Sequence, residues 1–228
     1  MSERKYYEAY DDRYRQVHAE NLQWFAEVPS KIVAEVIGRF GILHSSPILE
    51  IGCGEGRDAR PLLKQGFHLL ATDISPTAIT YCQKLDPEHA GHYSVLDCVS
   101  GQTNKRFDFI YAVAVLHMLV NDDDRTAFYR FIREHLTPNG IALICTMGDG
   151  TFERSSDIST AFDLQERTHE ESGKTLMIAG TSCRMVSFST FESEISQNSL
   201  ELVEMGATSI EPDFASMMYA VVKGGPHD

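Results

Sequence analysis

From Pro47 onward, short apolar runs alternate with segments whose apolar residues recur at helical spacing. Strands separated by helices of this length predict a parallel sheet with right-handed crossovers. The run at 107–113 is strongly apolar and is therefore expected near the centre of the sheet. The expected strands are 48–51, 68–73, 93–96, 107–113 and 141–146, and the expected helices are 57–65, one beginning at Ser75–Pro76, and 122–136.

The residues before this alternating region predict two helices. Residues 4–27 are amphipathic, because aromatic and apolar side chains recur near one face at every third or fourth position. Ser30 is placed to cap a second helix, which Gly41 would end. The aromatic stripe of the first helix consists of Tyr7, Tyr10, Tyr14 and Trp24.

After the last predicted parallel strand the pattern changes. Residues 150–188 are polar and irregular, with a hairpin expected around 172–174. Ser189–Glu192 matches a capping box, which predicts the start of another helix. Two strands, at about 200–210 and 216–223, then follow without a helix between them. We therefore expect an antiparallel hairpin at one edge of the sheet.

The charge of the chain narrows the classes of partner. It has 33 acidic against 20 basic residues and a formal net charge of −13. Such a surface repels phosphate backbones, so no nucleic-acid partner is expected, although a local basic groove could overrule the net charge. No apolar run approaches the ~20 residues that span a bilayer, and the N-terminal residues lack the apolar core of a signal peptide. These features predict a cytoplasmic protein with no membrane partner.

The five cysteines occur singly, without a C-x-x-C pair or a histidine cluster at metal-ligand spacing. An odd, scattered set predicts reduced thiols and neither disulfides nor a metal site.

The segment Ile48–Gly56 carries the sharpest motif in the chain. A strand ends there, three alternate glycines allow a tight turn, and a helix follows. This arrangement lets backbone N–H groups approach a ligand closely. Asp73 ends the next strand, 17 residues after Gly56, where a carboxylate can accept both hydroxyls of a ribose. A dinucleotide-binding G-x-G-x-x-G motif would need glycine where this chain has Arg57, which disfavours a nicotinamide-dependent dehydrogenase.

The G-x-G-x-G loop after an acid-bearing strand resembles motif I of the class I S-adenosylmethionine-dependent methyltransferases, and the resemblance extends over about 48–146. It implies that the loop lies against the methionine part of the cofactor, that Asp73 binds the ribose, and that Asp97 and Cys98 hold the adenine amine. Gly56–Ala59 is similar to the tellurite-resistance and thiopurine-type branch of that family. The implied cofactor-binding residues are Glu50, Gly52, Cys53, Gly54, Asp73, Ile74, Asp97, Cys98 and Ala112.

Three of these assignments have a plainer alternative. Asp73 could be a solvated acid at a strand end, and Asp97 could form an Asx turn. Glu50 could contact the cofactor through water or only orient the loop backbone.

The resemblance implies an α/β fold, a Rossmann-like three-layer sandwich with a mostly parallel seven-stranded sheet and an antiparallel final strand. We expect a single methyltransferase domain over 1–228. Its expected parts are an N-terminal helical lid at 1–41, a cofactor-binding core at 47–147, a substrate-specificity insertion at 148–188, and a C-terminal helix with edge strands at 189–228.

No residue is marked as catalytic by the sequence, and methyl transfer does not require one unless the acceptor arrives protonated. His117 and Asp149 are the candidates, against the alternatives of a packed histidine and a solvated loop acid. Arg184 could hold an acceptor carboxylate or be a surface arginine. The tyrosine stripe could be a lid or ordinary helix packing. The expected acceptor-binding residues are Tyr7, Tyr10, Tyr14, Trp24, His117, Met147 and Arg184.

The sequence therefore predicts an S-adenosylmethionine-dependent enzyme that methylates a small molecule by in-line displacement, as a monomer or a homodimer. Two alternatives stay open: a binding or regulatory protein that keeps the cofactor fold without catalysis, and a protein methyltransferase.

Overall fold

The computed structural model describes residues 4–25, 27–169 and 172–225. Within these residues a seven-stranded sheet has the order β10-β11-β5-β4-β1-β2-β3. Strand β11 is antiparallel to both of its neighbours, and the pairs from β5 to β3 are parallel. The strands are β1 (Ile48–Ile51), β2 (Leu69–Asp73), β3 (Tyr93–Val95), β4 (Phe107–Val113), β5 (Leu136–Met147), β10 (Leu200–Ile210) and β11 (Phe214–Gly224).

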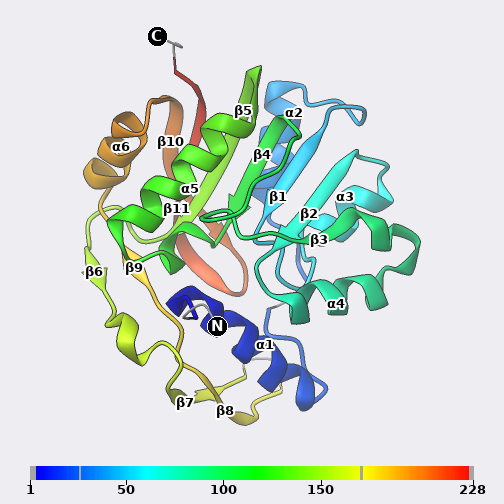
Figure 1. The fold of residues 1–228 in the computed structure, drawn as a ribbon, viewed down its shortest axis with the longest axis vertical. Helices are drawn as coiled ribbons and strands as arrows, with labels where there is room; N and C mark the ends of the chain where they lie inside the picture. The colour runs from blue at the N-terminus through cyan, green and yellow to red at the C-terminus, as the bar shows by residue number, and fades with distance from the viewer. Residues whose placement is uncertain (1–3, 26, 170–171, 226–228) are drawn as a thin grey trace.

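Helices cover both faces of the sheet, so the molecule has three layers (Figure 1). One apolar cluster joins α5 and α6 to one face, and a second joins α2, α3 and α4 to the other. The expected α/β sandwich with its antiparallel final strand is confirmed. The helices are α1 (Ala9–Ala19), α2 (Lys31–Phe40), α3 (Ala59–Lys64), α4 (Pro76–Leu85), α5 (Asp122–His135) and α6 (Phe188–Gln197), with single 3-10 turns η1 (Tyr6–Glu8), η2 (Pro87–His92), η3 (Leu116–Met118) and η4 (Ile158–Thr160).

The parallel register brings the ends of the central strands to one edge. Ile51 pairs with Thr72 on one side and with Ala112 on the other. The glycine loop, Asp73 and the residues after β4 therefore leave the sheet together. The central strands are almost wholly buried, in keeping with their apolar sequences.

The segment of the chain between β5 and α6 forms two small antiparallel pairs of strands outside the main sheet. Strands β7 (Leu164–Thr168) and β8 (Thr175–Ala179) form the hairpin expected around 172–174. Strands β6 (Arg154–Ser155) and β9 (Arg184–Met185) pair as well. Figure 1 shows α1 and the β7–β8 hairpin at the same end of the sheet, and α1 is hydrogen-bonded to β8 through Arg13 and Gln16.

The first predicted helix is wrong in its second half. Helix α1 ends at Ala19, and Asn21 has a φ of +57°, which a continuing helix does not allow. Residues 22–25 turn back toward the glycine loop in irregular backbone. Residues 1–3, 26, 170–171 and 226–228, which fall in the predicted lid, insertion and C-terminal segments, lie outside the described residues.

Two predicted helix starts also need correction. Ser30 stands at the N-cap position of α2, but its hydroxyl donates to Asp58 Oδ2 at 2.8 Å and caps nothing. The N-cap of helix α6 is Ser187, two residues before the predicted Ser189, because the Ser187 side chain accepts from the N–H of Thr190.

Strand β5 is longer than the expected strand at 141–146, because it already begins at Leu136. Its pairing with β4 passes from Phe107–Leu136 directly to Phe109–Ile141, so the residues in between bulge out of the sheet. Within the described residues, none of the helices has both the length and the apolar character that a membrane span requires.

A buried arginine joins α5 to α6 and to the turn η3. Arg125 is 2 % exposed and donates through two nitrogens to the Glu194 carboxylate, at 2.8 and 2.6 Å. Its third nitrogen donates to the carbonyls of Leu116 and Leu119 at 2.9 and 3.1 Å. Because η3 carries His117 and Met118, this arginine fixes the loop that follows β4.

We predict that Arg125→Ala lowers the free energy of unfolding by about 3 kcal/mol or more, because the part-buried Glu194 carboxylate loses its paired charge and keeps only the Tyr129 hydroxyl and a 3.8 Å contact with Arg184. Urea unfolding followed by circular dichroism measures this change. The matched control is Arg39→Ala, which removes an exposed pair with Glu204 and is expected to cost less than about 1 kcal/mol. Equal costs for the two variants would contradict the role given to Arg125.

Candidate functional site

The glycine loop between β1 and α3 lies against other parts of the chain at two positions that admit no side chain. Gly52 has a φ of +73°, and a Cβ there would lie 2.3 Å from Val115 Cγ2. Gly54 has a φ of +52°, and its Cβ would lie 2.7 Å from the hydroxyl of Tyr14. Glycine is therefore required both by the backbone conformation and by close packing.

Asp73 is held by the loop and by the start of α4. Its Oδ2 accepts from the N–H of Gly54 and its Oδ1 from the N–H of Ser75, both at 2.8 Å. Burial raises the pKa of this carboxyl to about 6, although the two backbone hydrogen bonds act in the opposite direction. Each oxygen still has a second lone pair with which it can accept a ligand hydroxyl.

Glu50 is 3 % exposed in the middle of β1 and lines the same cavity. Its Oε2 has no hydrogen-bond partner among the described residues. Burial, and then the nearby Asp58 carboxylate, raise the pKa of Glu50 well above its usual range. A buried carboxylate oxygen without a partner is costly, so this atom is suited to receive a hydrogen-bond donor or a positive charge from a ligand.

Asp97, which follows β3, also lines the cavity. Its Oδ1 accepts from the N–H of Val99 at 2.8 Å, so it forms the Asx turn considered above, and its Oδ2 accepts from the hydroxyl of Tyr7 at 3.3 Å. Ile74 and Cys98 line the cavity as expected. Ala112 does not, because it is fully buried in the sheet; Val113, Ala114 and Val115 line the cavity at that point.

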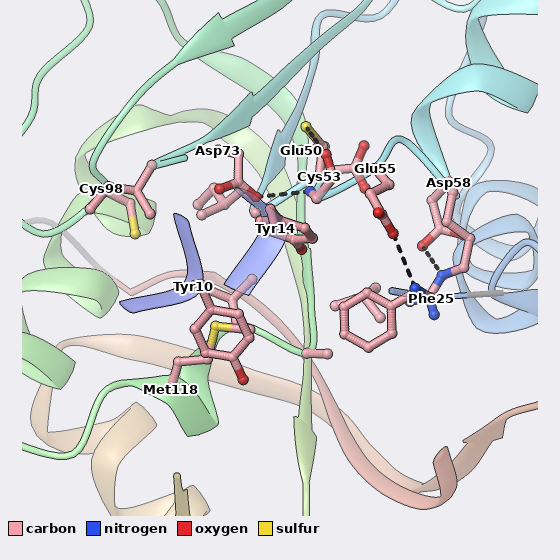
Figure 2. A pocket seen from close by; sticks show the side chains of 18 of the residues that line it. Tyr10, Tyr14, Phe25, Glu50, Cys53, Glu55, Asp58, Asp73, Cys98 and Met118 are labelled. Atoms are coloured by element: carbon pink, nitrogen blue, oxygen red, sulfur yellow. Dashed lines mark hydrogen bonds and ion pairs between the residues drawn. The ribbon is translucent and has the colours of Figure 1, made fainter. Parts of the chain in front are cut away.

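Aromatic side chains cover this cavity from the N-terminal segment. Figure 2 shows Tyr10, Tyr14 and Phe25 around it, opposite the strand ends that carry Glu50 and Asp73. Tyr7 also lines it. The cavity volume is about 90 Å³, well below the ~300–1,000 Å³ of typical ligand pockets. A ligand of nucleoside size therefore requires the covering segment to move outward.

Glu55 holds this segment in place and was not predicted. Glu55 is 4 % exposed, and its carboxylate accepts from the N–H of Trp24 at 2.9 and 3.0 Å and from that of Phe25 at 3.0 Å. His18 Nε2 is 2.8 Å from the same group. Because Glu55 occupies a variable position of the glycine motif, its sequence context contained no signal for this role. A second tie comes from His169 of the hairpin, whose Nε2 is 2.5 Å from the carbonyl of Gln23.

A second pocket, of about 640 Å³, adjoins the first. Tyr10, Gln23 and Phe25 line both, so the two pockets share this wall. Trp24, His117 and Met147 line the second pocket, as the expected acceptor-binding residues would. The predicted insertion contributes most of the remaining lining, and the turn between β10 and β11 closes one side.

His117 is 3 % exposed, and its Nδ1 has no hydrogen-bond partner in the described part of the chain. Burial, followed by the positive charges of Arg125 and Arg13, lowers the pKa of this imidazole to about 4. The ring is therefore neutral near pH 7 and can accept a hydrogen bond, but it is a weak base.

Two sequence candidates lie outside both pockets. Arg184 donates to the carbonyl of Val120 at 2.8 Å and pairs with Asp122 at 2.5 Å, so it ties β9 to the start of α5. Asp149 is exposed and accepts from the N–H groups of Thr151 and Phe152 at 2.8 and 2.9 Å, in an Asx turn. Within the described residues, no group of three or more His, Cys, Asp or Glu side chains is arranged to hold a metal ion.

Comparison with known proteins matches residues 49–142 to a family described as a methyltransferase domain. A ubiquinone biosynthesis O-methyltransferase from Rickettsia canadensis is 27 % identical over 118 residues, which cover 51 % of this chain and 49 % of that protein. The chain thus spans about half the length of the curated relatives it matches.

Solved structures extend the likeness to the whole fold. An S-adenosylmethionine-dependent methyltransferase from Clostridium acetobutylicum superposes with a TM-score of 0.66 at 13 % identity, over 97 % of this chain and 100 % of that one. A TehB-like S-adenosylmethionine-dependent methyltransferase from Corynebacterium glutamicum superposes with a TM-score of 0.58 at 22 % identity, over 96 and 97 % of the two chains. The predicted Rossmann-like methyltransferase fold is confirmed.

The pKa of Asp73 makes stability depend on pH. The folded protein binds this proton near pH 6, whereas an unfolded aspartate titrates near ~3.9, so ionising Asp73 costs folding free energy. We predict that wild-type protein loses about 1 kcal/mol relative to Asp73→Asn as the pH rises from about 5 to about 7. Urea unfolding of both proteins at each pH measures this difference. A difference that does not change with pH would show that Asp73 titrates normally.

Proposed function

We propose that this protein is an S-adenosylmethionine-dependent methyltransferase acting on a small molecule, because residues 49–142 match a methyltransferase-domain family and the chain has the Rossmann-like methyltransferase fold. The observation that carries the proposal is the pair of adjoining pockets. One is built on a glycine loop with Asp73 and an unpaired Glu50 oxygen, and the other lies across the wall of Tyr10, Gln23 and Phe25.

The residues of the first pocket fit the proposed cofactor. Asp73 has lone pairs left for ribose hydroxyls, and the loop brings backbone within reach at two positions where only glycine fits. The unpaired oxygen of Glu50 suits the positively charged methionine end of the cofactor. Six acids and two arginines line the cavity, an excess of negative charge that favours a cationic ligand.

S-adenosylmethionine, when bound, supplies a methyl group on a positively charged sulfur, which is already a good leaving group. The protein has to align the acceptor and exclude water. Near-attack alignment can supply roughly 7–11 kcal/mol of the barrier. The wall shared by the two pockets is where the two ligands would face each other, so Tyr10 and Phe25 would set their approach. The neutral imidazole of His117 would accept a hydrogen bond from the acceptor and so orient it.

The N-terminal segment would then act as a lid, and residues 148–188 as the insertion that selects the acceptor. The small volume of the first cavity supports the lid, since Tyr7, Tyr10 and Tyr14 occupy the space that a ligand needs. Tyr6 anchors the beginning of the segment, because its hydroxyl accepts from the N–H groups of Val120 and Asn121 and donates to Asp124. Helix α1 would therefore move between the anchors at Tyr6 and the Glu55 tie, and its hydrogen bonds to β8 through Arg13 and Gln16 would have to break or move with it.

The alternatives are less well supported. Arg57 occupies the position where the dinucleotide motif needs glycine, and its Nη1 lies 3.1 Å from Asp213 Oδ2. A second pocket of about 640 Å³ is of ordinary small-molecule size, which favours a small acceptor over a protein chain. A binding protein without catalysis has the same cofactor site, so turnover must separate these two functions.

The proposal predicts that S-adenosylhomocysteine and S-adenosylmethionine bind, and that NAD does not, in isothermal titration calorimetry. Asp73→Ala should weaken binding by about tenfold or more, because it removes a charged hydrogen-bond acceptor. Asp149→Ala is the matched control, since that acid is exposed and lies outside both pockets. Absence of binding by either adenosyl compound would overturn the proposal. Binding without acceptor-dependent release of S-adenosylhomocysteine, across a broad acceptor panel, would favour the non-catalytic alternative.

A further inference from the structure

The second pocket contains a buried arginine that pairs with no carboxylate of the described residues. Arg13 of α1 is 7 % exposed and lines this pocket. Its Nε and Nη2 donate to the carbonyl of Ala179 at 3.1 and 2.8 Å, and Nη2 also donates to that of Gly180 at 2.8 Å. Its Nη1 makes no hydrogen bond with any residue that the structure describes, and no acid of the described chain lies within ion-pair distance.

A buried charge of this kind is unusual, because buried ions are normally paired. The ring centroids of Trp24 and Tyr10 lie 4.8 and 5.1 Å from the guanidinium carbon, so both rings make cation–π contacts with the group. The carbonyls and rings stabilise the cation but do not neutralise it. None of the described residues supplies an anion to Nη1, so this nitrogen is available to bind one from a ligand.

The charge of the surrounding pocket agrees with this assignment. Arg154 and Arg167 also line it, and both are exposed at its rim. Among its described lining residues Asp213 is the only acid, and that carboxylate lies 3.1 Å from Arg57 of the neighbouring cavity. The described lining of this pocket therefore carries more positive than negative charge, although the chain as a whole has a net charge of −13.

Apolar and aromatic side chains form one part of the lining: Met147, Met185 and Phe214 together with Trp24 and Phe25. Polar residues such as Ser156, Thr160 and Gln165 form another part. The apolar part can bury a ring, while the arginine fixes one polar end of the same ligand.

We propose that the methyl acceptor carries an oxyanion group, a carboxylate or a phosphate, beside an apolar ring, and that Arg13 binds this oxyanion. The assignment of the ligand as the acceptor rests on the proposed function, but the anion preference of the pocket does not. Arg13 is a binding residue that would donate through Nη1, since Nε and Nη2 are held by the carbonyls of Ala179 and Gly180. Lysine would replace its charge but not this fixed geometry.

The test measures the preference of the full-length protein for an acid over the matching neutral amide. The probes are benzoate, phenylacetate and indole-3-acetate with their carboxamides, and phenyl phosphate to distinguish the two oxyanions. Calorimetric titrations are made with and without S-adenosylhomocysteine. We expect each acid to bind about tenfold or more tightly than its amide, as charge-assisted hydrogen bonds from arginine provide.

Variants distinguish a role of the Arg13 charge in binding the oxyanion from a purely structural role of this residue. Arg13→Gln should reduce the acid-to-amide ratio to near one, whereas a structural role would weaken both ligands equally. Should that variant fail to fold, the exposed pair Arg154→Gln and Arg167→Gln should lower the same ratio about two- to fivefold through the loss of rim charge. Arg39→Gln, whose surface pair with Glu204 lies outside both pockets, is the matched control and should leave the ratio unchanged.

The proposal is overturned if acids and amides bind equally, if neither binds while S-adenosylhomocysteine does, or if the preference persists in the arginine variants. If acids bind more tightly than their amides but no adenosyl compound binds, the anion site is supported and the methyltransferase function is not.

Discussion

The Glu55 carboxylate is the contact on which the rest of this site depends. It lies inside the glycine loop and accepts hydrogen bonds from the N–H groups of Trp24 and Phe25, with His18 beside it. Residues far apart in the sequence are thereby brought together. Because Tyr10, Gln23 and Phe25 line both pockets, this one carboxylate fixes the wall across which methyl transfer would take place.

Charge is divided across that wall. Acids predominate in the first cavity, where Glu50 and Asp73 are buried and the pKa of each is raised by burial. Arginines predominate in the second, where Arg13 lies against two rings and has no acid partner in the described part of the chain. Such a division would orient a cationic cofactor and an anionic acceptor toward each other, and it would disfavour either ligand in the wrong pocket. The surface charge of the chain as a whole reveals nothing of this division.

Much of the fold and the cofactor side of the site could be predicted from the sequence, because strand ends and a glycine motif are local signals. The parallel register then places Asp73, Asp97 and the loop at one edge. Glu55 and the end of α1 could not be predicted, since their partners are distant in the sequence. Arg13 had a weak signal: a charged residue three positions after Tyr10 and four before Val17, on the buried face of α1. Arg184 was expected to bind the acceptor but pairs with Asp122 at the start of α5, a contact that the sequence does not reveal.

The most direct measurement is a pair of titrations on Glu55→Ala, with circular dichroism to verify the fold. If Glu55 holds the shared wall, S-adenosylhomocysteine affinity should fall about tenfold or more, as expected for a lost buried acceptor. The preference for aromatic acids over their amides should fall in the same variant. Unchanged affinity and unchanged preference would contradict the account, because the two pockets would then be formed independently of this contact.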